Sequence, residues 1–219
     1  MVRALTEYRS LVFDCDGVLL DSNSVKTDAF YQAALPFGEK AANALVNYHV
    51  ANGGVSRYRK FEYFLSDIVK HENMEPLNEL LSRYAERVRD GLLACSVADG
   101  LGELRSALPN SNWMIVSGGD QGELREVFEA RGLSHYFNGG IFGSPTDKQE
   151  ILSRELKCSN LVLPAVFFGD SRYDHESAMK FGLDFVFISE WTEFSGWQNY
   201  FADQSTAVAH YENIRSLLA

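Results

Sequence analysis

The sequence has few cysteines and no long hydrophobic run. Its 3 cysteines, Cys15, Cys95 and Cys158, lie far apart without a Cys-x-x-Cys pair, so neither a zinc ribbon nor a disulfide framework is indicated. This cysteine usage fits a reducing compartment. Apolar stretches such as residues 161–168 are much shorter than the roughly 20 residues that span a bilayer, and residues 1–10 lack the apolar core of a signal peptide. We therefore expect a soluble, cytoplasmic protein.

Positive charge is also scarce in this chain. Lys and Arg number 20 against 30 Asp and Glu, which gives a formal net charge of -10. Nucleic acids and anionic membranes bind surfaces of the opposite sign, so neither is expected as a partner. An anionic ligand would need positive charge supplied locally. The chain has 46% hydrophobic residues, including 15 Phe, and this is enough apolar material for a folded core.

Short apolar runs predict the strands of a parallel sheet. The runs are continuous rather than alternating, which is typical of strands that are covered on both faces. They comprise residues 10–14, 113–117, 165–168 and 185–188. From about residue 97 such runs alternate with helical patterns, at residues 121–131, 148–156 and 171–181. This alternation predicts an α/β fold with a doubly wound, Rossmann-like parallel sheet.

The stretch from residue 22 to residue 95 differs, because it shows no strand-like run. Helical patterns cover it instead, at residues 25–35, 39–49, 56–69 and 76–93. A helical segment inserted directly after the first strand predicts an all-helical cap domain of residues 22–95. The α/β core domain then comprises residues 1–21 and 96–219. Ligands of such sheets bind at the carboxyl ends of the strands, where Asp14, Ser117 and Asp170 fall.

Two carboxylates, Asp14 and Asp16, follow the first predicted strand. The pair alone is weak evidence, because turn-forming and helix-capping acids are common. The longer run from Asp14 to Ser22, DCDGVLLDS, resembles the first motif, DxDGxxxDS, of haloacid dehalogenase-superfamily phosphatases. Further motifs of that superfamily are matched by Ser117 before two glycines, by Lys148 and by the GDSRYD run of residues 169–174. The insertion resembles the helical cap of the phosphoglycolate phosphatase and β-phosphoglucomutase branch.

These residue types are suited to phosphoryl transfer. A carboxylate is ionised at neutral pH, so Asp14 can attack phosphorus without an activating base and form an aspartyl-phosphate. Asp16 can protonate the leaving oxygen and then activate the water that hydrolyses this intermediate. The Ser117 hydroxyl and the amides of Gly118 and Gly119 can donate hydrogen bonds to phosphoryl oxygens.

The acids near this site require cations. A hard divalent ion with oxygen ligands, Mg²⁺, and the Lys148 ammonium would offset the repulsion between the carboxylates and a phosphate dianion. The resemblance implies that the metal is held by the Asp14 side chain, the Asp16 main-chain carbonyl and Asp170. It also implies that Asp174 supports Lys148 and metal-bound water. The alternative for Lys148 is an ordinary lysine in the first turn of a helix, because Gln rather than the family's usual Pro follows it.

The predicted cap contains one informative segment, residues 52–60, which combines two glycines with three cations where a helix begins. Its Gly-Val-Ser-Arg run resembles the substrate-specificity loop of β-phosphoglucomutases, so Arg57 is a candidate substrate residue. The alternative is a solvated first turn with an N-cap at Ser56. Asp21 and Ser22 are interpreted as caps of the next helix, and Cys15 is expected to face the core.

The sequence as a whole predicts a Mg²⁺-dependent phosphatase of a small phosphorylated metabolite, such as a sugar phosphate. A phosphomutase of the β-phosphoglucomutase type shares every motif, so this alternative stays open. A phospho-signalling receiver domain is also doubly wound and uses Asp, Lys and Mg²⁺, but receivers are shorter and lack an inserted cap. The substrate and the oligomeric state are not specified by the sequence.

Overall fold

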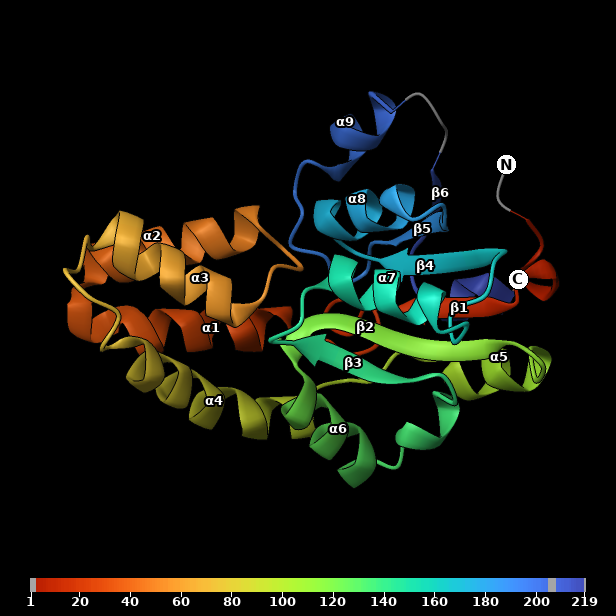
Figure 1. Cartoon of the computed structure of the whole chain (residues 1–219), viewed down its shortest axis with the longest axis horizontal. Coiled ribbons are helices and arrows are strands. Elements are labelled where there is room, and N and C mark those ends of the chain that lie inside the picture. The colour runs from red at the N-terminus through yellow and green to blue at the C-terminus, as the bar shows by residue number, and fades with distance from the viewer. Residues whose placement is uncertain (1–2, 205–207, 219) are drawn as a thin grey trace.

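A parallel six-stranded sheet lies at the centre of the computed structural model, which describes residues 3–204 and 208–218 (Figure 1). Its strands lie in the order β3-β2-β1-β4-β5-β6. In chain order they are β1 (Ser10–Phe13), β2 (Asn112–Asp120), β3 (Gly140–Ser144), β4 (Ala165–Gly169), β5 (Asp184–Ile188) and β6 (Ala209–Tyr211). The order reverses at β1, which pairs with both β2 and β4. The predicted α/β class and parallel sheet are confirmed.

Helices cover both faces of the sheet, because neighbouring residues of a strand point to opposite sides. Leu11 and Phe13 belong to a core formed with α5 (Leu101–Ala107) and α6 (Gln121–Ala130). Val12 belongs to a separate core formed with helices on the opposite face, namely α7 (Lys148–Lys157), α8 (Arg172–Lys180) and α9 (Trp197–Ala202). Continuous apolar strands are therefore buried on two sides, as the sequence predicted.

The helical insert lies beside the carboxyl ends of the strands (Figure 1). It contains α1 (Asn23–Ala34), α2 (Glu39–Ala51), α3 (Arg57–Tyr63) and α4 (Leu77–Ala94). Phe30 of α1 packs between Phe61 and Tyr84, with ring centroids 5.2 and 4.5 Å apart, and all three side chains are buried. This aromatic cluster of the insert is continuous with the hydrophobic core that covers the α5 and α6 face of the sheet. The limits of the insert at residues 22 and 95 as a separate domain stay a prediction.

Two sequence-based boundaries are wrong. The predicted helix of residues 56–69 is divided into α3 and a π-helical turn, Phe64–Ile68. The strand expected to end at Ser117 continues to Asp120, because β2 pairs with β3, which the apolar pattern did not reveal. Elements α5, α9, β3 and β6 were also not predicted.

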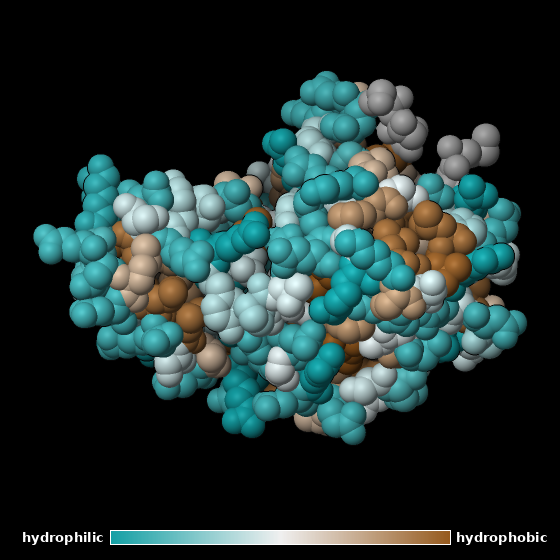
Figure 2. All heavy atoms as spheres, viewed as in Figure 1, coloured by the Kyte–Doolittle hydropathy of each residue, from teal (hydrophilic) through white to brown (hydrophobic). Residues whose placement is uncertain are grey.

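Hydrophilic residues cover most of the face shown in Figure 2, and hydrophobic residues gather in smaller patches. Among residues 3–204 and 208–218, no helix combines the length and the apolar composition needed to cross a membrane.

Candidate active site

The site is built where two neighbouring strands end. Asp14 follows β1, and its amide donates a hydrogen bond of 2.9 Å to the Phe168 carbonyl of β4. Asp170 follows β4, and Asp174 lies in the first turn of the next helix, α8. All three carboxyl groups are buried, and one oxygen of each lies within 4.8 Å of the others. The topological switch point of the sheet thus holds a compact acidic cluster.

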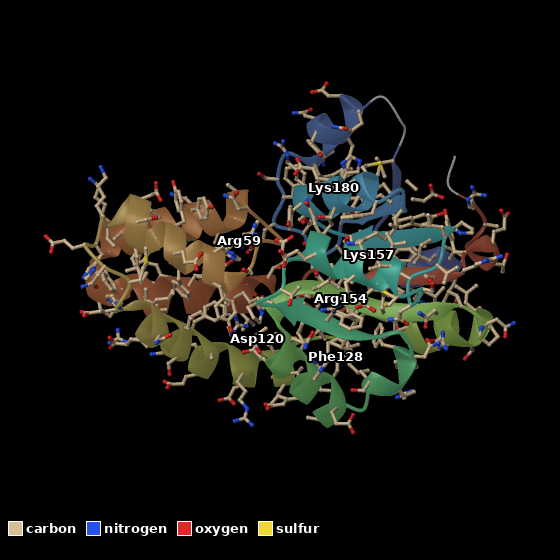
Figure 3. All side chains as sticks on the ribbon, in the orientation of Figure 1. Arg59, Asp120, Phe128, Arg154, Lys157 and Lys180 are labelled. Atoms are coloured by element: carbon tan, nitrogen blue, oxygen red, sulfur yellow. The ribbon has the colours of Figure 1, made fainter. Side chains whose placement is uncertain are left out.

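Lys148, the first residue of α7, supplies the positive charge of this cluster. Its Nζ lies 2.9 Å from Asp14 Oδ1 and 2.5 Å from Asp174 Oδ1. Burial lowers the pKa of this ammonium, but Asp14 and Asp174 outweigh burial and raise the pKa above its ordinary value. Lys157, the other lysine of α7, is exposed at the far end of the helix (Figure 3). The interpretation of Lys148 as an ordinary first-turn lysine is wrong, because a solvated lysine would not make these contacts.

The cluster has more negative than positive charge. Burial and the neighbouring Asp174 raise the pKa of Asp14 to about 7. Burial and Asp14 raise the pKa of Asp170 well above its ordinary value. One lysine cannot neutralise three carboxylates, and carboxylate oxygens are the ligands that a hard divalent cation prefers. The donor set and its uncompensated charge therefore fit a metal ion.

The Asp16 carboxylate is held away from this cluster by two other groups. Its Oδ2 accepts a hydrogen bond of 2.5 Å from Lys26 Nζ of α1, and its Oδ1 accepts one of 2.6 Å from Ser22 Oγ. Burial raises the pKa of Asp16, but Lys26 and Ser22 outweigh it and lower the pKa below its ordinary value. The Ser22 side chain makes no capping bond at the start of α1, so the capping interpretation is wrong. An ionised Asp16 is suited to accept a proton.

Glycine is required at two positions around the site. Gly17 has φ +76°, and a Cβ there would lie 2.1 Å from Asp170 Oδ2. A Cβ on Gly118 would lie 2.4 Å from the Gly54 carbonyl oxygen of the insert. The first glycine lets Asp170 approach the loop after β1, and the second lets the loop between α2 and α3 pack on β2.

Ser117 lies on β2, the strand that pairs with β1. Ser117 is buried, and its Oγ accepts a hydrogen bond of 3.0 Å from the Gly119 amide. Gly118 and Gly119 line the cavity described below. Asn23, which the sequence analysis did not single out, donates a hydrogen bond of 3.0 Å from Nδ2 to Asp170 Oδ2.

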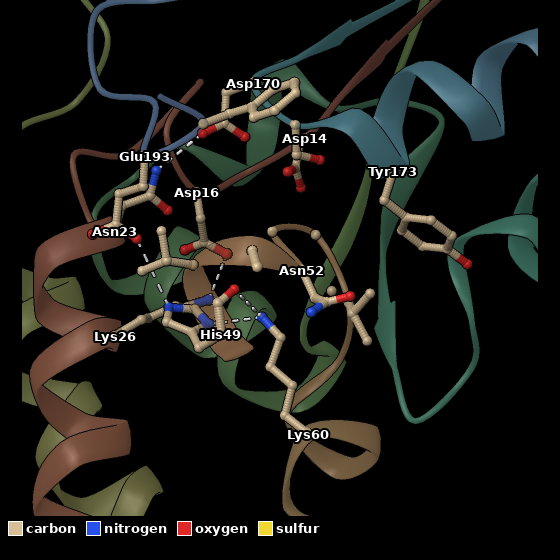
Figure 4. A pocket seen from close by; sticks show the side chains of 18 of the residues that line it. Asp14, Asp16, Asn23, Lys26, His49, Asn52, Lys60, Asp170, Tyr173 and Glu193 are labelled. Atoms are coloured by element: carbon tan, nitrogen blue, oxygen red, sulfur yellow. Dashed lines mark hydrogen bonds and ion pairs between the residues drawn. The ribbon is translucent and has the colours of Figure 1, made fainter. Parts of the chain in front are cut away.

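A cavity of about 340 Å³ lies between the carboxyl ends of the strands and the insert (Figure 4). Asp14, Asp16 and Asp170 line it on the core side. The insert contributes five further ionisable side chains to the lining, Lys26, His49, Arg57, Lys60 and Tyr84. The insert thus adds cations to a cavity whose core side is mainly acidic.

Arg57 lines this cavity but also joins the insert to the core. Its Nη1 donates a hydrogen bond of 3.1 Å to Glu123 Oε2 of α6, and its Nη2 donates to the other carboxylate oxygen. The guanidinium carbon lies 4.4 Å from the centroid of the Tyr84 ring. Arg57 is 5% exposed, so the solvated-turn interpretation is wrong for it, although Ser56 does cap α3. Contact between Arg57 and a substrate stays a prediction.

Two further cations of the insert were given no role by sequence reasoning, Lys26, which was not singled out, and Lys60, which was noted only as one of the three cations of residues 52–60. Lys26 and Lys60 are cations within segments that also supply buried apolar residues. A lysine within an apolar helix face could have been recognised from the sequence as a candidate functional residue, because a buried cation needs a partner. The partner itself depends on how the insert folds over the sheet edge.

The chain belongs to a family of hydrolases. Residues 8–182 match the family model of haloacid dehalogenase-like hydrolases, which is well over half of the chain. A search of curated proteins finds no match. A receiver domain, the alternative from another class, does not account for the inserted helices.

Solved structures share the fold at low sequence identity. A candidate phosphoglycolate phosphatase from Lactobacillus plantarum has 18% identity and a TM-score of 0.69, with 94% of this chain and 95% of that chain covered. A haloacid dehalogenase-like family hydrolase from Streptococcus pneumoniae has 21% identity and a TM-score of 0.63, with 94% and 96% covered. CbbY from Rhodobacter sphaeroides, solved in complex with phosphate, has 16% identity and a TM-score of 0.67, with 96% of each chain covered. Such identities establish the fold alone.

Proposed function

We propose that this hydrolase is a Mg²⁺-dependent phosphatase that hydrolyses a small phosphorylated metabolite through an aspartyl-phosphate on Asp14. One observation carries the proposal most directly. A buried carboxylate at a strand end is oriented by Lys148 and faces a cavity of about 340 Å³, which suits a small ligand.

Asp14 is oriented for attack by two hydrogen-bond donors. The Cys15 amide donates to Asp14 Oδ1 at 2.8 Å, and Lys148 Nζ lies 2.9 Å from the same oxygen. In-line attack on a phosphoryl group requires the ionised form of Asp14, and a bound divalent cation would favour that form against the burial and the Asp174 charge that raise its pKa to about 7. The ammonium of Lys148 also offsets charge on the phosphoryl oxygens.

Asp16 is the proposed acid and base. Protonated Asp16 gives its proton to the leaving oxygen, and ionised Asp16 takes a proton from the water that attacks the aspartyl-phosphate. Lys26 stabilises the ionised form, which is the form required for the second step. Ser117 and Gly118, in the C-terminal half of β2, are the proposed phosphate-binding residues.

Mg²⁺ would be held by the side chains of Asp14 and Asp170 and by the Asp16 main-chain carbonyl. When bound, it supplies positive charge that screens the carboxylates from the phosphoryl oxygens. Asp174 is assigned a supporting role, because both of its oxygens already have donors. Lys148 contacts Oδ1, and the Ser171 amide and hydroxyl donate to Oδ2.

A phosphate-release screen with sugar phosphates, phosphoglycolate, nucleotides and p-nitrophenyl phosphate tests this proposal. We expect Mg²⁺-dependent release from at least one small ester and none from the Asp14→Asn variant. Interconversion of sugar phosphate isomers without net phosphate release would instead establish the phosphomutase alternative. Equal release by wild type and Asp14→Asn would contradict the proposed nucleophile.

A further inference from the structure

One buried cation of the insert lacks an acidic partner. Lys60 is 1% exposed, and its Nζ contacts His49 Nδ1 at 2.7 Å. Among the described residues, the other buried cations at this cavity each pair with a carboxylate: Lys26 with Asp16 and Arg57 with Glu123. Lys60 forms no such ion pair within that part of the chain. A buried ammonium without a counter-ion is unfavourable, so this position calls for an anion.

The ring of His49, which lies beside Lys60, has one unpartnered nitrogen. An ammonium can only donate, so Nδ1 of His49 accepts from Lys60. Burial, and then Lys60, lowers the pKa of His49 well below its ordinary value, which leaves a neutral ring with its proton on Nε2. This buried Nε2 has no hydrogen-bond partner in residues 3–204 and 208–218, and the nearest carboxylate oxygen, Glu193 Oε2, is 3.9 Å away. The Nε2–H group therefore lacks an acceptor.

Both residues line the cavity that Asp14 faces (Figure 4). They belong to the insert side of this cavity, whereas the acidic cluster belongs to the core side. Phe30 shields the pair, with its ring centroid 4.4 Å from that of His49 and 5.5 Å from Lys60 Nζ. An ion pair formed in such a desolvated position is stronger than one in water. A substrate whose phosphoryl group lies at Asp14 would present its remote end to this wall.

We propose that Lys60 and His49 form a subsite for a second anionic group of the substrate, a carboxylate or a second phosphoryl group. This inference rests on the proposed phosphatase function. Lys60 supplies the positive charge for an oxygen of this anionic group, and the Nε2–H of His49, on the side of the imidazole ring opposite to Lys60, is a donor for a different oxygen of the substrate. A sugar hydroxyl would satisfy the hydrogen bonds but would leave the buried charge of Lys60 without compensation.

Matched pairs of substrates test the subsite. One pair is phosphoglycolate and 2-hydroxyethyl phosphate, which differ in the carboxylate. The other is propane-1,3-diol bisphosphate and its monophosphate, which differ in the second phosphoryl group. We expect wild-type kcat/KM to favour the member with the second anion in at least one pair, and that pair identifies the anion.

Lys60→Met removes the charge at nearly constant side-chain volume, and such replacements of buried charges are often tolerated. We expect it to lower the kcat/KM ratio within the preferred pair by about 10- to 100-fold, the range for a charged hydrogen bond, mainly through KM. His49→Phe keeps the ring against Phe30 and should lower the ratio in the same direction. Lys40→Met, at an exposed position of α2, is the matched control and should leave the ratio unchanged.

Two outcomes overturn the subsite alone. The first is a wild-type kcat/KM ratio near one in both substrate pairs. The second is a kcat/KM ratio that neither Lys60→Met nor His49→Phe changes. In both cases p-nitrophenyl phosphate is still hydrolysed. Absence of phosphate release from p-nitrophenyl phosphate and from both pairs by the wild type would overturn the proposed function, and the subsite with it.

Discussion

The buried ammonium of Lys60 predicts how the stability of the protein depends on pH. Burial, and then the nearby charge of Lys26, lowers the pKa of Lys60 from 10.5 to about 7. The unfolded chain keeps the ordinary value. Between about pH 7 and pH 10.5 the unfolded state therefore binds a proton that the folded state has released, so this residue makes folding more favourable as pH rises.

The magnitude follows from the size of this shift. One pKa unit corresponds to about 1.4 kcal/mol, so Lys60 should contribute a rise of about 2 kcal/mol in the free energy of unfolding between pH 7 and pH 9. Below about pH 7 the cost of burying the charge is fully present. Lys60→Met has no charge to bury at this position. The free energy of unfolding of this variant should therefore exceed that of the wild type most at pH 6, and the difference should shrink towards pH 10.

Urea unfolding of wild type, Lys60→Met and Lys40→Met at pH 6, 7, 8 and 9 measures this difference. Titration of other groups is common to all three proteins and cancels in the comparison. Lys40 is exposed and carries no burial cost, so its variant should follow the wild type. Parallel curves for wild type and Lys60→Met would refute the claim that Lys60 is a desolvated cation.

Three further predictions concern the site and its connection to the insert. Asp16→Asn should lower kcat for an alkyl phosphate by about 10²- to 10⁴-fold, because an alkoxide leaving group needs a proton. Steady-state kinetics measure this effect, and a kcat that matches the wild type would refute the assignment of Asp16. EDTA should abolish phosphate release and Mg²⁺ should restore it, while Ca²⁺ should support it poorly because its coordination is larger and looser; full activity of metal-free protein would contradict the metal site. Glu123→Ala leaves the buried Arg57 unpaired and should lower the free energy of unfolding in urea by about 3 kcal/mol, whereas an unchanged value would show that the pair does not stabilise the protein.

The strands that the sequence predicts are those with continuous apolar runs. Such runs mark β1, β2, β4 and β5 because each is buried on both faces. Strand β3 escaped prediction because glycine occupies positions 140 and 143 and breaks its apolar run. Strand β6 has three residues, none of them buried, so no hydrophobic pattern marks it.

The core side of the site was predictable, because apolar runs place Asp14 and Asp170 at strand ends and because the motifs that contain Asp14, Lys148 and Asp170 resemble those of a known superfamily. The insert side was not. The contacts of Lys26, His49 and Lys60 depend on how four helices fold over the sheet edge, and helical periodicity specifies a face rather than its partner. Ser22 was assigned to the helix end because capping is a local preference, whereas its hydroxyl donates to the carboxylate of Asp16.

The covalent step on Asp14 is the central claim, and detection of the phosphorylated residue tests it most directly. In Asp16→Asn, attack on p-nitrophenyl phosphate needs no proton donor, because p-nitrophenolate is a good leaving group, whereas hydrolysis of the intermediate lacks its base. The phosphoryl group should therefore accumulate on the enzyme. Acid quenching followed by peptide mass spectrometry should locate it on Asp14 and should find none in the Asp14→Asn, Asp16→Asn double variant. Phosphorylation of another residue, or continued phosphate release by the double variant, would contradict the account.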